Sequence, residues 1–141
     1  MGEIGEVKAG PALLQLLSEA DCPEGVQLVA IATIDRIGFR SAAPAIESFT
    51  RHHNIQLQLF AYKALADFGK DVDKELLFSF LQDKDYVTRQ NACGALASVK
   101  GEDVTAKLQA VAKNDNNESV RSIAHISLIE RQLKQKSDNE K

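Results

Sequence analysis

Apolar residues recur along the chain with a helical spacing, and a longer repeat is laid over that spacing. In residues 87–99, Ala92, Leu96 and Val99 fall at positions i, i+4 and i+7, which is typical of one face of a helix and lacks the alternation of a strand. The pattern returns about every 31 residues. It predicts one long helix per repeat, whose aligned residues form two apolar columns: Ala30, Ala61, Ala92 and Ala124, then Ile34, Leu65, Leu96 and Leu128.

Glycines and short polar residues mark the expected ends of the long helices. Gly38 and Gly69 follow the first two at the stop position, where the last residue often adopts a left-handed conformation. Asn54, Asp85 and Asn117 precede the later three, and their side chains can accept hydrogen bonds from the first free backbone N–H groups.

A second, shorter apolar pattern lies between the long helices. Residues 44–49 align with residues 11–16 at an offset of 33. Pro11 and Pro44 fit the first turn of a helix, where the missing N–H is not needed. The apolar places of the next two units are filled by Leu77, Phe80, Leu108 and Val111. The unit is therefore a long helix, a tight turn, a short helix and a polar loop.

One such unit cannot bury its apolar face alone, so we expect the units to stack into a continuous core. A small residue in the alanine column lets neighbouring helices approach closely, whereas leucine there would overpack the contact. The predicted fold class is all-α, an α-α superhelix of about four stacked helix pairs.

The repeat resembles the short HEAT-like repeats, of the kind named after phycocyanobilin lyases. Their usual unit reads Val-Arg-x-x-Ala-x-x-x-Leu, then Gly, then Ala-x-Pro-x-Leu. Gln27 and Gln58 stand where arginine is usual. Three segments carry the match: residues 120–128 in full, residues 88–96 with Thr for Val, and residues 42–46 for the second half. The resemblance covers about residues 4–130 and implies a HEAT-like solenoid, an architecture that serves many functions.

The two ends of the chain depart from the repeat. Ile4-Gly5 aligns with Ile37-Gly38, so residues 1–5 look like the last turn of a long helix, and the array opens in the middle of a repeat. This favours the carboxyl-terminal part of a longer array; the alternative is a small protein whose first helix is frayed. Arg131 stands at an otherwise apolar place, which favours a polar closing helix. We expect a repeat domain over residues 1–135 and a disordered tail over residues 136–141.

Composition and charge narrow the classes of function. The net charge is −3 and tryptophan is absent, which disfavours nucleic acid as a partner. The amino terminus lacks the features of a secretory signal, and no apolar stretch is long enough to span a membrane. Cys22 and Cys93 are far apart and have no metal-site spacing, so we expect free thiols in the cytoplasm.

Few side chains suggest chemistry. The chain has no phosphate-binding loop, metalloprotease helix or nucleophile elbow, so we expect no enzyme activity, cofactor or metal. His52 and His53 are adjacent and point in different directions on a helix, which makes a poor chelate. His125 follows Ala124 of the apolar column, and we expect it to be partly buried.

Two arginines occupy the same place in successive repeats. Arg89 and Arg121 are 32 residues apart and lie near several acids in the turns. We expect each to pair with one of them, namely Asp83, Asp85 or Asp115. The alternative is that these arginines contact a ligand.

The outward columns of the short helices form the candidate binding surface. Phe78 points off the apolar face that Leu77 and Phe80 define, so it would be an aromatic among polar residues, as protein-binding surfaces tend to show. The alternative is that Phe78 turns into the core of the neighbouring unit. The predicted partner-binding residues are Glu47, Arg51, Phe78, Gln82, Gln109 and Lys113.

The leading interpretation is a non-catalytic protein–protein interaction or scaffold module that uses the face of the short second helices. The resemblance leaves a bilin-lyase-like subunit or fragment as the alternative, and a nucleic-acid-binding HEAT-like module as a weaker third. The open amino-terminal end predicts self-association through exposed leucines, which are Leu13, Leu14, Leu16 and Leu17.

Overall fold

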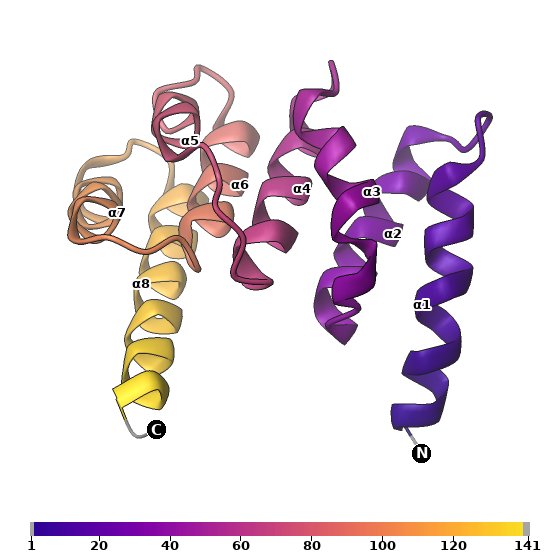
Figure 1. Ribbon diagram of the computed structural model, residues 1–141. Helices are drawn as coiled ribbons and strands as arrows, with labels where there is room; N and C mark the ends of the chain where they lie inside the picture. Colours follow the sequence, from indigo (N-terminus) through magenta and orange to yellow (C-terminus); the bar gives the residue numbers. More distant parts are fainter. Residues whose placement is uncertain (1, 140–141) are drawn as a thin grey trace. The chain divides into compact units, whose positions relative to one another are not determined.

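The computed structural model describes the backbone of residues 2–139 and the side chains of residues 9–138. Within this part the chain is built from helices and contains no strand, which confirms the predicted all-α class (Figure 1). The helices are α1 (Gly2–Ser18), α2 (Glu24–Ile37), η1 (Arg40–Ala42), α3 (Ala43–Glu47), η2 (Ser48–Arg51), α4 (Ile55–Asp67), α5 (Lys74–Phe80), α6 (Tyr86–Leu96), α7 (Glu102–Asn114) and α8 (Glu118–Asn139). None of these described helices is both long and apolar enough to cross a membrane.

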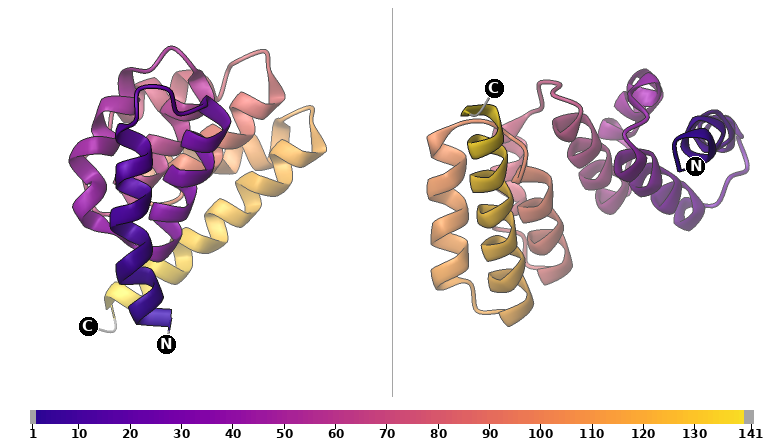
Figure 2. Two further views of the ribbon diagram at one scale, coloured as in Figure 1. Left: turned by 90° about the vertical axis from the view of Figure 1, so that its right-hand side faces the viewer. Right: turned by 90° about the horizontal axis from the view of Figure 1, so that it is seen from below.

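The chain divides into two compact units, Met1–Lys70 and Asp71–Lys141. In unit 1, α2 packs against α1 and α4, and the short helix α3 packs against α4. In unit 2, α5 packs against α6, and α8 packs against both α6 and α7; Figure 2 shows α6, α7 and α8 side by side. The helices α3, α5 and α7 therefore each contact the helix that follows them. The expected order of a long and then a short helix does not hold for α6 and α7, since α6 has 11 residues and α7 has 13.

The cores of both units contain the predicted columns. Ala30, Ala61, Ala92 and Ala124 are at most 2% exposed. Ile34, Leu65 and Leu96 are buried as well, whereas Leu128 is half-buried. The small alanine side chains let each long helix approach its neighbours closely. The register of the repeat is therefore confirmed.

The predicted helix ends are also confirmed. The side chains of Asn54 and Asp85 accept backbone N–H groups of α4 and α6, and Asn117 Oδ1 accepts the N–H of Val120 at 3.1 Å. Gly38 and Gly69 adopt φ angles of 73° and 80° after α2 and α4. A side chain with a Cβ is strained there, so glycine ends these helices cleanly.

The amino-terminal part differs from the prediction. Helix α1 is continuous, and Pro11 lies inside it instead of opening a separate short helix. The expectation that one helix ends near Gly5 and a separate short helix begins at Pro11 is therefore wrong. The absence of a side chain at Gly10 lets the ring of Phe39 pack against α1, because a Cβ at this position would collide with that ring. Residues 2–5 begin this same helix; Met1 and the side chain of Ile4 lie outside the described residues.

The carboxyl-terminal helix is longer than expected. Helix α8 has 22 residues and ends at Asn139, so residues 136–139 are helical although we expected a disordered tail from residue 136. The sequence there contains no glycine or proline to end a helix. Residues 140–141 lie outside the described part, and the extent of the repeat domain stays a prediction.

His125 corrects another expectation. Its neighbour Ala124 is fully buried, but His125 itself is exposed. Successive residues of a helix are turned by about 100° from one another, and the face of α8 that packs inward carries Ala124 and Ser127. The residue after Ala124 therefore leaves the inward face.

Candidate functional site

The predicted partner-binding residues are divided between the two units. Glu47 ends α3 and Arg51 ends η2, and both are exposed in unit 1. Phe78 lies on α5, Gln82 follows that helix, and Gln109 and Lys113 lie exposed on α7 in unit 2. The prediction that all six residues form one face stays a prediction, and the geometry below concerns unit 2 alone.

Phe78 lies between the two alternatives of the sequence analysis. Its side chain is half-buried, so it is neither a core residue like Leu77 nor a free aromatic. The ammonium nitrogen of Lys107 on α7 lies 5.4 Å from the centroid of the Phe78 ring, which is within the range of a cation–π contact. Phe78 therefore connects the exposed sides of α5 and α7.

An open groove lies beside this contact. Its volume is about 500 Å³. It is lined by α6, by α7, by the loop between α5 and α6 and by the loop between α7 and α8. The lining residues are Leu81, Gln82, Asp83, Arg89, Lys107, Ala110, Val111, Asn114, Asp115 and Asn116. Of the predicted residues, only Gln82 lines it. The spacing of Lys107, Ala110 and Asn114 at i, i+3 and i+7 marks one helix face, which is the signal that the sequence analysis did not use.

Arg89 forms one wall of the groove, and all three nitrogens of its guanidinium donate hydrogen bonds. Its Nε lies 2.9 Å from Oδ2 of Asp115 and its Nη2 lies 3.1 Å from Oδ1, in a bidentate pair. Nη1 donates to the carbonyl of Asp83 at 2.9 Å, and Arg121 donates to the carbonyl of Asp115 at 2.7 Å. The expected pairing with an acid is therefore confirmed for Arg89, whereas Arg121 bonds the backbone carbonyl of Asp115 instead of a carboxylate.

The pair is well shielded from water. The side chains of Arg89 and Asp115 are 13% and 8% exposed. Burial alone would raise the pKa of Asp115, but the hydrogen bonds from Arg89 and from the Asn117 amide lower it below its usual value. The hydrogen bond to Asp115 likewise raises the pKa of Arg89. Both groups stay charged, and each neutralises the other.

Some polar side chains of the groove form no hydrogen bond or ion pair with the described residues. The structure gives the side chains of Gln82 and Asn114 no hydrogen bond within residues 9–138, and no carboxylate there pairs with Lys107. Asn116 uses its Oδ1 to accept from Arg89. The groove therefore presents an ammonium group and side-chain amides that water or a bound segment can satisfy.

The geometry can now be compared with known proteins. Residues 73–129 match the family of HEAT repeats. This segment is a HEAT-repeat domain. It runs from the start of α5 into α8 and contains the whole groove. HEAT repeats form α-α superhelices, are generally protein-interaction scaffolds and are typically non-catalytic. The match does not distinguish the phycocyanobilin-lyase kind from other HEAT repeats. No curated protein matches the chain.

Arg131 lies just beyond the HEAT-repeat segment, which ends at residue 129, and has a structural role that the sequence did not indicate. We expected a polar cap residue, but the side chain is half-buried. Its guanidinium donates to the carbonyls of Leu96, Val99 and Gly101 and to Thr105 Oγ1. Burial lowers its pKa. Arg131 therefore connects α8 to the segment between α6 and α7.

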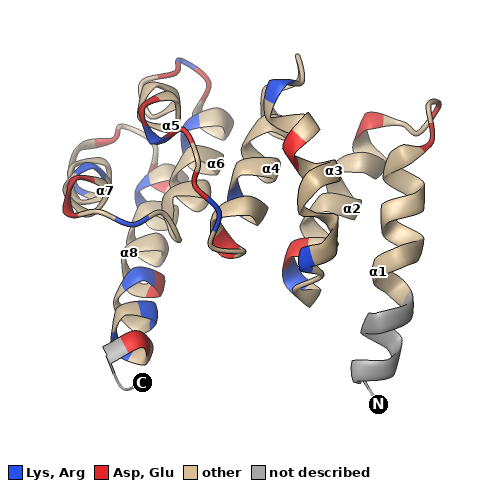
Figure 3. Ribbon diagram, in the orientation of Figure 1, with Lys and Arg blue, Asp and Glu red and all other residues tan. Residues whose placement is uncertain are grey.

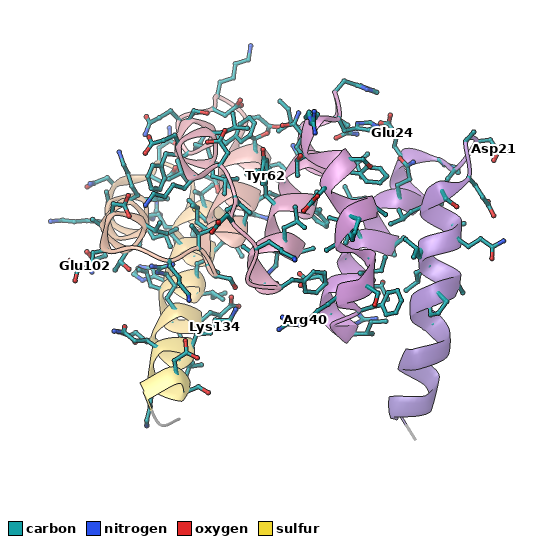
Figure 4. All side chains as sticks on the ribbon, viewed as in Figure 1. Asp21, Glu24, Arg40, Tyr62, Glu102 and Lys134 are labelled. Atoms are coloured by element: carbon teal, nitrogen blue, oxygen red, sulfur yellow. The ribbon has the colours of Figure 1, made fainter. Side chains whose placement is uncertain are left out.

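The two adjacent histidines lie beside a carboxylate in unit 1. Glu24 Oε2 lies 3.2 Å from His53 Nε2 and 3.8 Å from His52 Nε2, and Figure 4 shows Glu24 at the start of α2. His52 Nδ1 accepts the backbone N–H of Asn54 at 3.0 Å, so a neutral His52 carries its proton on Nε2. That nitrogen cannot bind a metal while the bond to Asn54 stands, because a ligating histidine donates from its other nitrogen.

Cys93 is expected to be chemically inert. It is fully buried, and burial raises the pKa of its thiol to about 12, whereas the half-buried Cys22 lies in the loop before α2. Because the thiolate is the reactive form, iodoacetamide should modify Cys22 in the native protein and reach Cys93 only after denaturation. Peptide mass mapping measures this, and equal native rates at both cysteines would show that Cys93 is accessible.

Proposed function

We propose that this protein is a non-catalytic protein-interaction module that binds a partner along α5 and α7 of unit 2, the second helices of the repeats. The observation that carries the proposal is the open groove next to Phe78, which presents the ammonium of Lys107 and the side-chain amides of Gln82 and Asn114. The scaffold role common to HEAT repeats supports it.

The shape and composition of the groove favour a segment of a protein chain over an enclosed small molecule. Its volume of about 500 Å³ lies within the range of about 300–1,000 Å³ for ligand clefts. However, the groove is open, and polar and charged side chains line it together with the apolar Leu81, Ala110 and Val111. Ala110 on the exposed side of α7 leaves room for a main chain to approach. The amides of Gln82 and Asn114 can bond either the N–H or the C=O of such a chain.

The charges around the groove do not favour nucleic acid. Its lining contains the cations Arg89 and Lys107 and the carboxylates Asp83 and Asp115, and Figure 3 shows both signs along α5, α7 and their loops. Binding to phosphates needs a basic stripe. In our proposal the module acts in the cytoplasm, since the free thiols of Cys22 and Cys93 suit a reducing compartment.

Site-specific photo-crosslinking tests the proposal. A photoreactive residue placed at Gln82 lies in the groove, whereas one placed at the exposed Gln135 on α8 lies outside it. In cells that express the protein, we expect the Gln82 position to capture a partner that the Gln135 position does not capture. Mass spectrometry of the crosslinked species identifies the partner and the position that contacts it.

The same pair of positions can contradict the proposal. Capture of one partner from Gln135 and not from Gln82 would place the binding surface on α8 or on another face. Equal capture of the same proteins from both positions would show non-specific proximity instead of a groove-bound partner.

A further inference from the structure

Helix α8 presents a second apolar stripe that the fold of unit 2 does not use. Ile126, Ile129 and Leu133 are 49%, 55% and 63% exposed. Their spacing of three and four residues places them on one face of the helix. Figure 1 shows the last turns of α8 extending beyond α6 and α7. Three large aliphatic side chains on one line form a continuous apolar surface, unlike scattered exposed residues.

The opposite face of α8 is the one that holds the helix in place. Ala124 is fully buried, and Ser127 Oγ donates to the carbonyl of Cys93 at 2.9 Å. Arg131 bonds the carbonyls of Leu96 at the end of α6 and of Gly101 before α7. These inward residues lie roughly half a helical turn away from Ile126 and Ile129. The exposed aliphatic residues of α8 are therefore not needed to hold the helix in place, and a line of large apolar side chains on the exposed side is typical of a contact surface.

The repeat itself does not require large residues at these places. One repeat earlier, 32 positions before Ile126, Ile129 and Leu133, the chain has Gly94, Ala97 and Gly101. Two repeats earlier it has Lys63, Ala66 and Lys70. The aliphatic stripe is therefore particular to α8.

We propose that the α8 stripe, defined as Ile126, Ile129 and Leu133, is a self-association surface that packs against the same stripe of a second copy in parallel register. In that register each aliphatic residue meets its equivalent. His125 and Glu130 flank the stripe on opposite sides and are both exposed. They are five residues apart, the spacing at which flanking residues of parallel paired helices meet across the contact. Each His125 thus faces Glu130 of the second copy.

An antiparallel pairing of the two α8 helices is less favourable than the parallel one. An antiparallel pair centred on Ile129 would bring Glu130 of one copy against Glu130 of the other, and like charges at such a contact repel. In the parallel pair the remaining helices of unit 2 point away from the contact, because they pack on the opposite side of α8. Three side chains fall short of the surface of about 800 Å² per partner typical of stable complexes, so the dimer is weak and depends on concentration.

Sedimentation equilibrium of the full chain from micromolar to millimolar concentration tests the proposal. The parent chain should form dimers at the higher concentrations. Ile129→Asp and Leu133→Asp should each weaken dimerisation by about tenfold or more, since an unpaired charge would enter an apolar contact. Val29→Asp is the matched control, because Val29 is 62% exposed on α2, outside the stripe, and this variant should dimerise like the parent.

The outcomes separate this surface from others. A monomer at every concentration overturns the proposal. Dimerisation that survives both stripe variants also overturns it, and then places self-association elsewhere, for example at the amino-terminal end. All three changes replace exposed residues, so we expect each variant to stay folded. Far-ultraviolet dichroism and thermal melting of each variant check this.

Disulfide crosslinking tests the parallel register. In a Cys22→Ser background, Leu133→Cys should give a covalent dimer on mild oxidation, because the two copies of this position face each other across the contact. Gln135→Cys in the same background is the control, since Gln135 is exposed but lies off the stripe. Absence of the Leu133→Cys crosslink in a chain that still dimerises through the stripe overturns the parallel register.

Discussion

Replacing Asp115 with alanine is expected to destabilise unit 2 by about 3–5 kcal/mol, which is the usual cost of removing one partner of a buried ion pair. The change leaves the guanidinium of Arg89, whose side chain is 13% exposed, without its bidentate carboxylate. It also removes the acceptor of the Asn117 N–H at the start of α8. Denaturant unfolding followed by circular dichroism measures the loss.

The destabilisation caused by Asp115→Ala should become smaller as the pH is lowered into the acid range. The pKa of Asp115 is lowered in the folded protein, so the folded state favours the ionised carboxylate. Its contribution is fully present above the unfolded pKa of about 3.9 and is lost as pH falls through the folded value. The difference between the parent and Asp115→Ala should therefore be constant near neutral pH and shrink in acid.

Asp71 supplies the matched control for this substitution. It is exposed in the loop before α5, and Asp71→Ala should change the free energy of unfolding by no more than about 0.5 kcal/mol. If Asp115→Ala costs no more than Asp71→Ala at neutral pH, the pair with Arg89 does not stabilise the fold.

Enlarging the alanine column is the second change with a large expected effect. Ala92 is completely buried in α6, and Ala92→Leu adds atoms where neighbouring helices approach closely. Overpacking of this kind costs roughly 1–3 kcal/mol. Ala106→Leu makes the same change on the exposed side of α7 and should stay within about 0.5 kcal/mol. Thermal melts of the two variants that coincide would mean that helices do not pack closely at Ala92.

The fold was largely predictable because it depends on short-range patterns. The apolar columns fall at helical spacing, and Asn54, Asp85 and Gly38 cap helices that begin or end beside them. These signals act within one or two turns, so a single sequence displays them. The continuity of α1 through Pro11 was not predictable in this way, because it depends on packing against α2 and on the contact between Gly10 and Phe39.

The candidate site was predicted only in part because its side chains come from segments far apart along the chain. Lys107 reaches Phe78 across 29 residues, and Arg89 reaches Asp115 across 26. Only the arginine pairing was foreseen, because the repeat placed Arg89 and Arg121 at equivalent positions. Nothing in the sequence linked Glu24 to His53, or Arg131 to the end of α6. These contacts depend on how neighbouring helices are turned about their axes.

The most direct measurement of the central claim is the affinity of the partner captured at Gln82 for the Phe78→Ala variant, determined together with the thermal stability of that variant. Phe78 is half-buried beside Lys107, and its ring can be covered by a partner at low entropic cost. We predict that binding weakens by on the order of 1 kcal/mol or more while the variant still folds and melts close to the parent. A loss of stability of about 3–5 kcal/mol, as for a core phenylalanine, or unchanged affinity in a folded variant, would contradict binding through this groove.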